Sequence, residues 1–306
     1  MGGTNSVFGL VDKEGVIHVR GKIDTSSVLS PENLIELISG EVKKAFLSLS
    51  KQVVLKGVGI GAPNGNYFTG TVKFAPNMRW KGEVRVAKLF YKNLGVKSVL
   101  TNDANAAALG EMLFGKAKNI KDFLFITLGT GLGSGIVANG QLIYGHDGFA
   151  GELGHVVIDR KGRKCGCGRQ GCLETYASAT GIKKTYQELL EINNISSEFH
   201  PDTHGSNYIY EKAIRGEKEA IEAFDYTACM LAFGLVNSVV YTSPKVIYLF
   251  GGLSQAGELL LKPLRAYFEQ NLLNIYQDKI AIEISGLPNN DAAILGAASL
   301  LWKENI

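Results

Sequence analysis

The sequence is poor in the features that mark secreted, membrane-spanning and polyanion-binding proteins. Its 306 residues include only four cysteines and seven prolines, and 32 basic residues nearly balance 29 acidic ones, for a net charge of +3. So small a charge gives no sign of a nucleic acid or other polyanion as a partner. No signal-peptide pattern opens the chain, and no uninterrupted apolar run reaches the roughly 18 residues of a membrane span. These absences, with cysteine usage that suits a reducing compartment, predict a cytoplasmic protein without a membrane partner.

Glycine, by contrast, is plentiful: 37 residues predict many tight turns and places where the backbone approaches a ligand closely. The length allows two medium-sized domains, because single cores rarely grow beyond roughly 250–300 residues. The longest apolar run, residues 230–240, is interrupted by Gly234, Asn237 and Ser238 and fits a core helix.

Three of the four cysteines form the run Cys165-Gly-Cys167-Gly-Arg-Gln-Gly-Cys172. His155 lies ten positions upstream, and Glu152 and Glu174 bracket the stretch. Three thiolates, one imidazole and glycines that let the loop fold back are what a tetrahedral structural zinc needs. The alternative is a disulfide beside unrelated residues, and Cys229 stands apart in an apolar run typical of a buried thiol. A zinc-braced loop is expected to present Glu152, His155 or Glu174 to a ligand.

Two parts of the chain repeat the order glycine-threonine turn, strand, short turn and strand. The copies occupy residues 2–4, 7–11, 12–15 and 16–19, and residues 128–133, 135–138, 139–140 and 141–144. Helical stretches (31–47 and 178–190) and further strands (53–60 and 245–250) follow them. The duplication predicts an α/β fold with two similar lobes facing a cleft. The second copy has a leading strand, residues 123–127, so the symmetry predicts a strand of five or more residues ahead of Met1.

The glycine-threonine turns are candidate phosphate sites, because consecutive glycines let backbone N–H groups converge on an anion. The residues are Gly2, Gly3, Thr4, Gly129, Thr130 and Gly131. A further pair, Gly251-Gly252, follows an apolar strand, at the position where open α/β sheets bind nucleotides. Plain hairpin turns are the alternative reading. No GxxxxGK[ST] run is present and no GxGxxG follows a first strand, which excludes the P-loop and Rossmann modes.

Asp103 is the candidate general base. It lies between an apolar strand, residues 99–101, and a strongly helix-forming run that starts at Ala104. It also suits the role of helix N-cap, and the two roles are compatible. Asn102 beside it is a neutral hydrogen-bond partner for a ligand.

Taken together, these residues resemble the ROK family of sugar kinases, within the actin-like, hexokinase-like (ribonuclease H-like) ATPase fold. The resemblance covers nearly the whole chain. It is carried by Gly2-Gly3-Thr4, Gly61-Ala-Pro-Asn-Gly65, Pro76-Asn77 with Trp80, Asn102-Asp103-Ala-Asn105-Ala, residues 128–135, Glu152-Leu-Gly-His155, the run Cys165–Glu174, and Gly251-Gly252. The Glu-x-Gly-His pair with the cysteine run is the most specific of these motifs.

The resemblance implies ATP-dependent phosphorylation of a hexose, with glucose at O6 as first choice, in carbohydrate metabolism and glycolysis. It implies a structural zinc on His155, Cys165, Cys167 and Cys172. It also implies a small-molecule sugar held by Asn77, Asn102, Asp103, Glu152, His155 and Glu174. Asp103 would accept the proton of the attacking hydroxyl, while the glycine turns and Mg²⁺ hold ATP. A homodimer or homotetramer is expected.

The lobes are predicted at residues 1–110, with a C-terminal helix at about 289–306 packing back on them, and at residues 111–288, with the zinc loop at 155–172. The family's opening motif is Asp-x-Gly-Gly-Thr, and its Asp is associated with Mg²⁺. Here Met1 stands at the x position, so the motif predicts Asp and a strand upstream of it. A protein that truly begins at Met1 is expected to have weak or no kinase activity, and Asp12 should not substitute.

Three other functions remain open at this point. An N-acetylmannosamine or N-acetylglucosamine kinase would share the pocket chemistry. A sugar-responsive transcriptional regulator would need a DNA-binding helix-turn-helix, and no basic recognition helix is evident. A sugar-binding protein without catalysis is disfavoured by the presence of Asp103.

Overall fold

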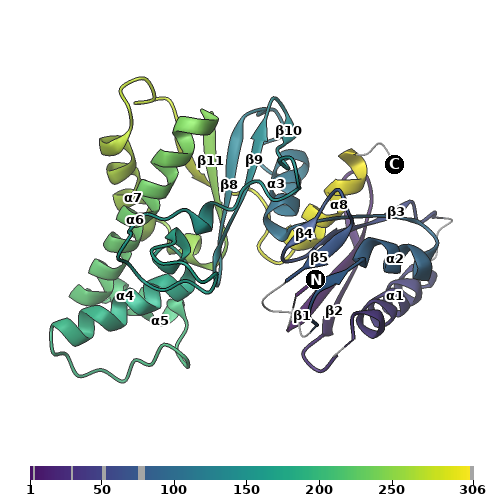
Figure 1. Cartoon of the computed structure of the whole chain (residues 1–306), viewed down its shortest axis with the longest axis horizontal. Coiled ribbons are helices and arrows are strands. Elements are labelled where there is room, and N and C mark those ends of the chain that lie inside the picture. Colours follow the sequence, from purple (N-terminus) through teal and green to yellow (C-terminus); the bar gives the residue numbers. More distant parts are fainter. Residues whose placement is uncertain (3, 29, 50–52, 75–79, 304–306) are drawn as a thin grey trace. The chain divides into compact units, whose positions relative to one another are not determined.

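The computed structural model describes the whole chain except residues 3, 29, 50–52, 75–79 and 304–306. Contacts divide it into two compact units (Figure 1). Unit 1 comprises residues 1–120, 141–150 and 286–306, and unit 2 comprises residues 121–140 and 151–285. Unit 1 therefore includes residues 111–120 and 141–150, which were predicted to lie in the C-terminal lobe. The reason is that α3 (Asp103–Phe114) continues past residue 110 and β10 (Gln141–Leu142) contacts it.

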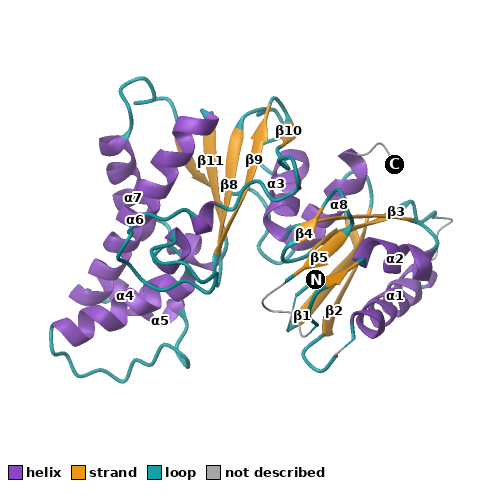
Figure 2. Ribbon diagram, in the orientation of Figure 1, coloured by secondary structure: helices purple, strands orange, loops and turns teal. Residues whose placement is uncertain are grey.

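Unit 1 is a mixed α/β unit (Figure 2). Besides α3 and β10, its strands are β1 (Asn5–Val11), β2 (Ile17–Asp24), β3 (Gly57–Gly61), β4 (Gly65–Asn66), β5 (Thr71–Lys73), β6 (Glu83–Val84) and β7 (Lys97–Thr101), and its helices are α1 (Pro31–Leu47), α2 (Val86–Leu94) and α8 (Ala292–Lys303). β1 pairs antiparallel with β2, and β3 pairs parallel with β7. In the described residues these are two separate two-stranded sheets.

Sequence signals account for the elements of unit 1. Helix α1 begins and ends as predicted: Ser30 caps it by accepting a hydrogen bond from the N–H of Asn33, and Pro31 takes its first turn. β2 runs five residues beyond the predicted end at residue 19, because its register on β1 continues from Val11 to Asn5. Residues 53–56, predicted as strand, lie outside β3.

The strands of unit 2 pair in the order β9-β8-β11-β12. β8, β11 and β12 are parallel to one another, and β9 is antiparallel to β8. The bounds are β8 (Phe123–Leu128), β9 (Leu132–Ala138), β11 (Val246–Phe250) and β12 (Ala281–Ile284), with helices α4 (Ala179–Ile192), α5 (Ser206–Ile214), α6 (Lys218–Thr242) and α7 (Glu258–Asn271). β8 pairs parallel with β11 and antiparallel with β9. β9 begins at Leu132, three residues earlier than predicted, so the turn after β8 is only residues 129–131.

Helix α6 forms the centre of the helical layer of unit 2 and packs against α4, α5 and α7. By length and composition alone it could cross a membrane, but Leu231, Leu235 and Val239 are fully buried within the core of this unit. The predicted core helix over residues 230–240 is therefore part of a longer helix with one buried face, while Phe233 and Val240 on it are 42% and 48% exposed.

Helix α8 lies against β3 and α3 at very short range. A Cβ placed on Gly59 of β3 would lie 1.7 Å from the carbonyl oxygen of Ala297. Glycine is required here because the obstructing atom belongs to the backbone of α8, which cannot move aside as the end of a flexible side chain could.

We therefore expect Gly59→Ala to destabilise unit 1 by about 1–3 kcal/mol, because α8 must shift to admit one methyl group. The matched control is Gly40→Ala in helix α1, where a Cβ would meet nothing within 4 Å. That change should leave stability unaltered or raise it by about 0.5–1 kcal/mol. Both tryptophans, Trp80 and Trp302, belong to unit 1, so denaturant unfolding followed by tryptophan fluorescence reports on this unit. Equal stability of the two variants would contradict the packing argument.

Candidate active site and metal centre

Asp103 lies at the carboxyl end of a buried parallel strand, at the first turn of α3. The helix is capped by Asn102, whose side-chain oxygen accepts a hydrogen bond of 2.6 Å from the N–H of Asn105. The suggestion that Asp103 is the cap is therefore wrong by one residue. Asp103 is the first helical residue and its side chain is exposed, with Oδ1 accepting a bond of 3.0 Å from the N–H of Ala104. Because Asn102 fills the cap, Asp103 has an oxygen left for another partner.

The two glycine turns of unit 2 lie side by side at the carboxyl ends of β8 and β11. Thr127 and Phe250, near the ends of these strands, are paired in register. Gly251 has a φ of 106° and approaches β8 so closely that a Cβ there would lie 2.6 Å from the carbonyl oxygen of Leu128. Gly129 and Gly252 face open space, since a Cβ on either would meet nothing within 4 Å. This edge of the sheet is thus lined by bare backbone, as an anion site requires.

In unit 1 the predicted phosphate turn is held by Thr25. Its hydroxyl donates to the carbonyl oxygen of Gly2 at 2.8 Å, and its N–H donates to the carbonyl oxygen of Thr4 at 2.9 Å. Gly3 lies outside the described residues. So does Asn77, a predicted sugar ligand.

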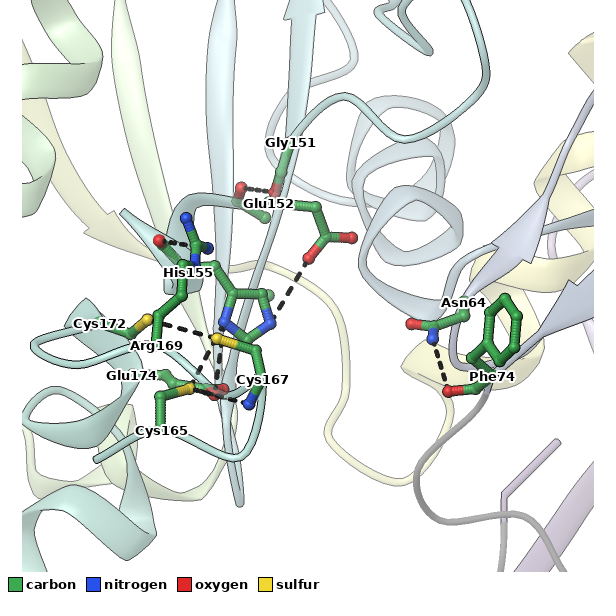
Figure 3. Close-up of polar contacts among 12 residues, drawn as sticks. Asn64, Phe74, Gly151, Glu152, His155, Cys165, Cys167, Arg169, Cys172 and Glu174 are labelled. Carbon is green, nitrogen blue, oxygen red and sulfur yellow. Dashed lines mark hydrogen bonds and ion pairs between the residues drawn. The ribbon is translucent and has the colours of Figure 1, made fainter. Parts of the chain in front are cut away.

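The Cys3His set predicted from the sequence comes together in unit 2 (Figure 3). The ligand atoms of His155, Cys165, Cys167 and Cys172 all lie within 4.8 Å of one another. Cys167 Sγ is 3.6 Å from Cys172 Sγ, and Cys165 Sγ is 3.7 Å from His155 Nδ1. Ligands at usual zinc distances subtend tetrahedral edges of about 3.5–3.8 Å. The described cysteines are all free thiols, so the disulfide alternative is not seen.

Glycines fold this loop back on itself, as predicted. Gly168 and Gly171 have φ values of 89° and 72°, and a Cβ on Gly171 would lie 1.5 Å from the carbonyl oxygen of Asp159. The N–H of Cys165 donates to the carbonyl oxygen of Arg169 at 2.8 Å and closes the tight turn around the sulfurs. Glycine spacing therefore sets the shape of the cluster.

The three thiols differ in pKa because their surroundings differ. Burial raises the pKa of the Cys165 and Cys172 thiols, whereas hydrogen bonds from the backbone and guanidinium of Arg169 lower the pKa of Cys167 to about 6. Without a metal, two of the three sulfurs keep their protons at neutral pH. A Zn²⁺ ion bound there would displace these protons and supply the charge that stabilises all three sulfurs as thiolates.

The histidine presents its two ring nitrogens to different neighbours. Nδ1 faces Cys165 Sγ and lies 3.6 Å from Glu174 Oε1, while Nε2 lies 4.0 Å from Glu152 Oε2. One nitrogen is therefore available to the metal and the other to a ligand held with Glu152, whose side chain is 49% exposed. Figure 3 shows Glu152 extending away from the sulfurs.

Glu174 connects the loop of residues 155–172, called the metal loop below, to the glycine turn after β8. Its Oε1 accepts a hydrogen bond of 3.0 Å from Cys165 Sγ. Its Oε2 lies 2.7 Å from the position of a Cβ on Gly131, so the absence of a side chain there makes room for the carboxylate. The phosphate turn and the metal loop are thus neighbours within unit 2.

Two arginines stabilise the loop, and neither was picked out from the sequence. Arg163 is nearly buried and donates to the carbonyl oxygens of Thr175 and Gly181 while pairing with Glu188 of α4. Arg169 donates to the carbonyl oxygen of His155 at 2.8 Å. No sequence signal marks them, since a basic residue in a polar loop is usually a solvated one.

Asn64, in the motif 61–65, also has a structural role that the sequence did not reveal. Its φ is 52°, and its amide donates to the carbonyl oxygens of Lys73 and Phe74 at 3.0 and 3.1 Å (Figure 3). It therefore ties the turn after β3 to the end of β5.

Removing one ligand should abolish metal binding. We expect Cys172→Ser to lower the zinc content of the purified protein from about one to near zero per chain, because a neutral hydroxyl replaces a buried thiolate. Cys229→Ser is the matched control, since Cys229 lies in α6 outside the cluster. Plasma emission spectroscopy measures the content, and chelator titration should release the same amount from the parent chain. A metal-free parent chain with an ordered loop would refute the site.

The chain matches the ROK family over residues 1–304. It is 34% identical to a glucokinase of Thermotoga maritima, over all of this chain and 96% of that protein. It is 33% identical to a xylose repressor of Caldicellulosiruptor bescii, over 89% of this chain and 68% of that protein. Among solved structures, a ROK glucokinase from Streptomyces griseus in complex with glucose and AMPPNP superposes with a TM-score of 0.78 at 32% identity, covering 98% and 96% of the two chains. Similarity over the whole length, with the cysteine run intact, shows that this chain belongs to the ROK family.

Proposed function

We propose that this protein is an ATP-dependent sugar kinase that phosphorylates glucose at O6. The observation that carries the proposal is the adjacency, within unit 2, of the glycine turn after β8 and the metal loop, which meet at Glu174 and Gly131. The glycine turn suits a nucleotide phosphate, and the polar side chains of the metal loop suit sugar hydroxyls. Relatives that are glucokinases, and a homologous glucokinase that holds glucose and an ATP analogue, support the same reaction.

Asp103 acts as the general base. Its carboxylate accepts the proton of the sugar hydroxyl while that oxygen forms a bond to the γ-phosphorus and the bond to the β–γ bridging oxygen breaks, which gives sugar phosphate and ADP. Its exposure and its place at the start of α3 leave it available for this contact. Residues Gly2, Thr4, Gly129, Thr130, Gly131, Gly251 and Gly252 bind the nucleotide, and Mg²⁺ supplies charge to the phosphates.

The sugar is recognised by polar side chains that bond hydroxyls in both directions. Glu152 and Glu174 accept hydrogen bonds, and the Nε2 of His155 bonds a hydroxyl, which leaves Nδ1 as the nitrogen that would hold zinc. Asn102 offers its side-chain NH₂ group, since its side-chain oxygen already accepts the N–H of Asn105 and caps α3. A zinc ion held by His155, Cys165, Cys167 and Cys172 would supply rigidity to the loop that carries these groups. Asn77 is a further ligand of the sugar in this proposal. Two or four identical chains form the assembly.

Two alternatives keep specific support. An N-acetylmannosamine or N-acetylglucosamine kinase would use the same Glu152 and His155. A sugar-binding protein without catalysis is consistent with the similarity to a xylose repressor. The exposed carboxylate of Asp103 favours the kinase.

The test is ADP release against a panel of glucose, mannose, N-acetylglucosamine and N-acetylmannosamine, with sugar binding measured by calorimetry. It uses the 306-residue chain and a chain with aspartate placed ahead of Met1, which completes the Asp-x-Gly-Gly-Thr motif. We expect the highest kcat/KM for glucose. A higher value for an N-acetylhexosamine would assign the second kinase activity, and tight sugar binding without ADP release from either chain would overturn the kinase assignment.

Replacing the base should separate catalysis from binding. Asp103→Asn should lower kcat by about 10²–10⁴-fold with the Kd for glucose nearly unchanged, because the amide keeps the hydrogen bonds but cannot take the proton. Asp202→Asn is the control, since Asp202 is exposed in a loop of unit 2 with a side chain 87% accessible. Normal turnover in Asp103→Asn would show that another group is the base.

A further inference from the structure

Helix α3 carries a second carboxylate, Glu111, which is fully buried in unit 1. It lies about two helical turns beyond Asp103, and the proposed reaction does not use it. A carboxylate without access to water costs free energy unless hydrogen-bond donors surround it. The groups that bond to Glu111 therefore indicate what it does in this fold.

Backbone N–H groups from two separate segments bond to Glu111. Its Oε1 accepts hydrogen bonds from the N–H of Lys116 at 2.8 Å and from the N–H of Gly286 at 2.9 Å. Its Oε2 lies 3.2 Å from the same nitrogen of Gly286. The main-chain oxygen of Glu111 accepts the N–H of Gly115 at 3.0 Å and that of Ala117 at 3.3 Å. One residue thus collects the N–H groups of residues 115–117 and of a residue far away in the chain.

Both segments lie where the chain passes from one unit to the other. The chain leaves unit 1 after Ile120 and returns to it at Gly286. Ser285, the last residue of unit 2 before this return, donates its N–H to the carbonyl oxygen of Leu249 at 2.9 Å within unit 2. A single peptide link therefore separates a residue bonded inside unit 2 from a residue bonded to Glu111. The connection has little slack at this point.

Glycines let both segments approach the carboxylate as bare backbone. A Cβ on Gly115 would lie 2.4 Å from the Cδ of Glu111. A Cβ on Gly286 would lie 2.9 Å from the backbone nitrogen of Lys116. The space that two side chains would fill is thus occupied by the carboxylate and its donors.

Asp103 and Glu111 belong to one rigid element. Helix α3 has 12 residues and is therefore about 18 Å long. It packs on α8 so closely that a Cβ on Gly110 would lie 3.0 Å from the Cα of Gly296. A displacement of the end that carries Glu111 is therefore passed to the end that carries Asp103.

We infer that Glu111 is a positioning residue for the proposed reaction. Its carboxylate fixes the end of α3 to the two chain segments that lead to and from unit 2, and so fixes the place of Asp103. The inference rests on the proposed function, because Asp103 belongs to unit 1 whereas Glu152 and the glycine turn after β8 belong to unit 2. Glu111 acts through Asp103 and takes no proton itself.

The test is a double-mutant cycle on kcat with Glu111→Gln and Asp103→Asn. The amide keeps the size of the side chain but is neutral, and it places an NH₂ group beside N–H donors, so the hydrogen bonds to Lys116 and Gly286 weaken. We expect Glu111→Gln to lower kcat about tenfold in the parent chain, because a small misplacement of a catalytic group is costly. In the Asp103→Asn background the same change should lower kcat less than about twofold, because the base is already lost.

A residue with only a structural role would lower kcat by the same factor in both backgrounds, and that result would overturn the inference. The matched control is Glu36→Gln, because Glu36 is exposed on α1 of the same unit, and it should leave kcat unchanged. Tryptophan fluorescence checks that each variant is folded at the assay temperature. Gly286→Ala replaces Glu111→Gln in the cycle if the latter does not fold, since its methyl group would push the backbone of Lys116 away.

A second measurement does not depend on turnover. Spin-labelled amino acids are introduced by codon suppression at two exposed residues, Lys92 of α2 in unit 1 and Lys184 of α4 in unit 2, and pulsed EPR records the distances between them. We expect Glu111→Gln to widen the distribution of distances relative to the parent chain and to Glu36→Gln. An unchanged distribution would overturn the inference even with an active kinase. A wider distribution without any ADP release would uphold the connection through Glu111 and contradict the proposed function instead.

Discussion

The arrangement of the candidate site depends on the register of parallel strands. Paired parallel strands end at one edge of a sheet, so the residues that follow them are brought together regardless of their distance along the chain. In unit 2 this places the turns after Leu128 and Phe250 in contact, although about 120 residues separate them. In unit 1 it places the turn after Gly61 beside Asn102 and Asp103, since Gly61 and Thr101 are paired. Backbone hydrogen bonding thus gathers the polar residues.

The loop that carries the Cys3His set depends on a second constraint, which is the backbone conformation of a short, glycine-rich segment. Glycines at residues 168 and 171 take backbone conformations that other residues adopt at a cost, and they let Cys165, Cys167 and Cys172 face one point. Arg163 then anchors the loop to α4. A metal ion bound by its four ligands would add rigidity to this loop. Rigidity matters because the same loop carries Glu152, His155 and Glu174.

Comparison of the two units shows how far duplication constrains a fold. In unit 2, β8 lies between β9 and β11, whereas in the described part of unit 1, β1 and β3 belong to separate sheets and line an apolar groove of about 670 Å³. Exposing apolar side chains beside unpaired backbone to water costs free energy, because the side chains stay hydrated and the N–H and C=O groups lack protein partners. The hydrogen bond between Met1 and Gly61 lies at one end of this groove.

Elements whose cause is local follow directly from the amino-acid sequence. Ser30 and Pro31 set the start of α1, the apolar run 123–127 became β8, and the Cys3His spacing predicted a cluster that the structure assembles. It also identified the family through those motifs. Other helix caps and strand ends depend on contacts with residues far away in the chain, and these are set only in the folded protein. The cap of α3 is Asn102 rather than Asp103, β2 extends as far as β1 can pair with it, and β9 begins three residues early. The roles of Arg163, and of Gly59 under Ala297, arise from contacts between segments far apart in the chain, which no local pattern encodes.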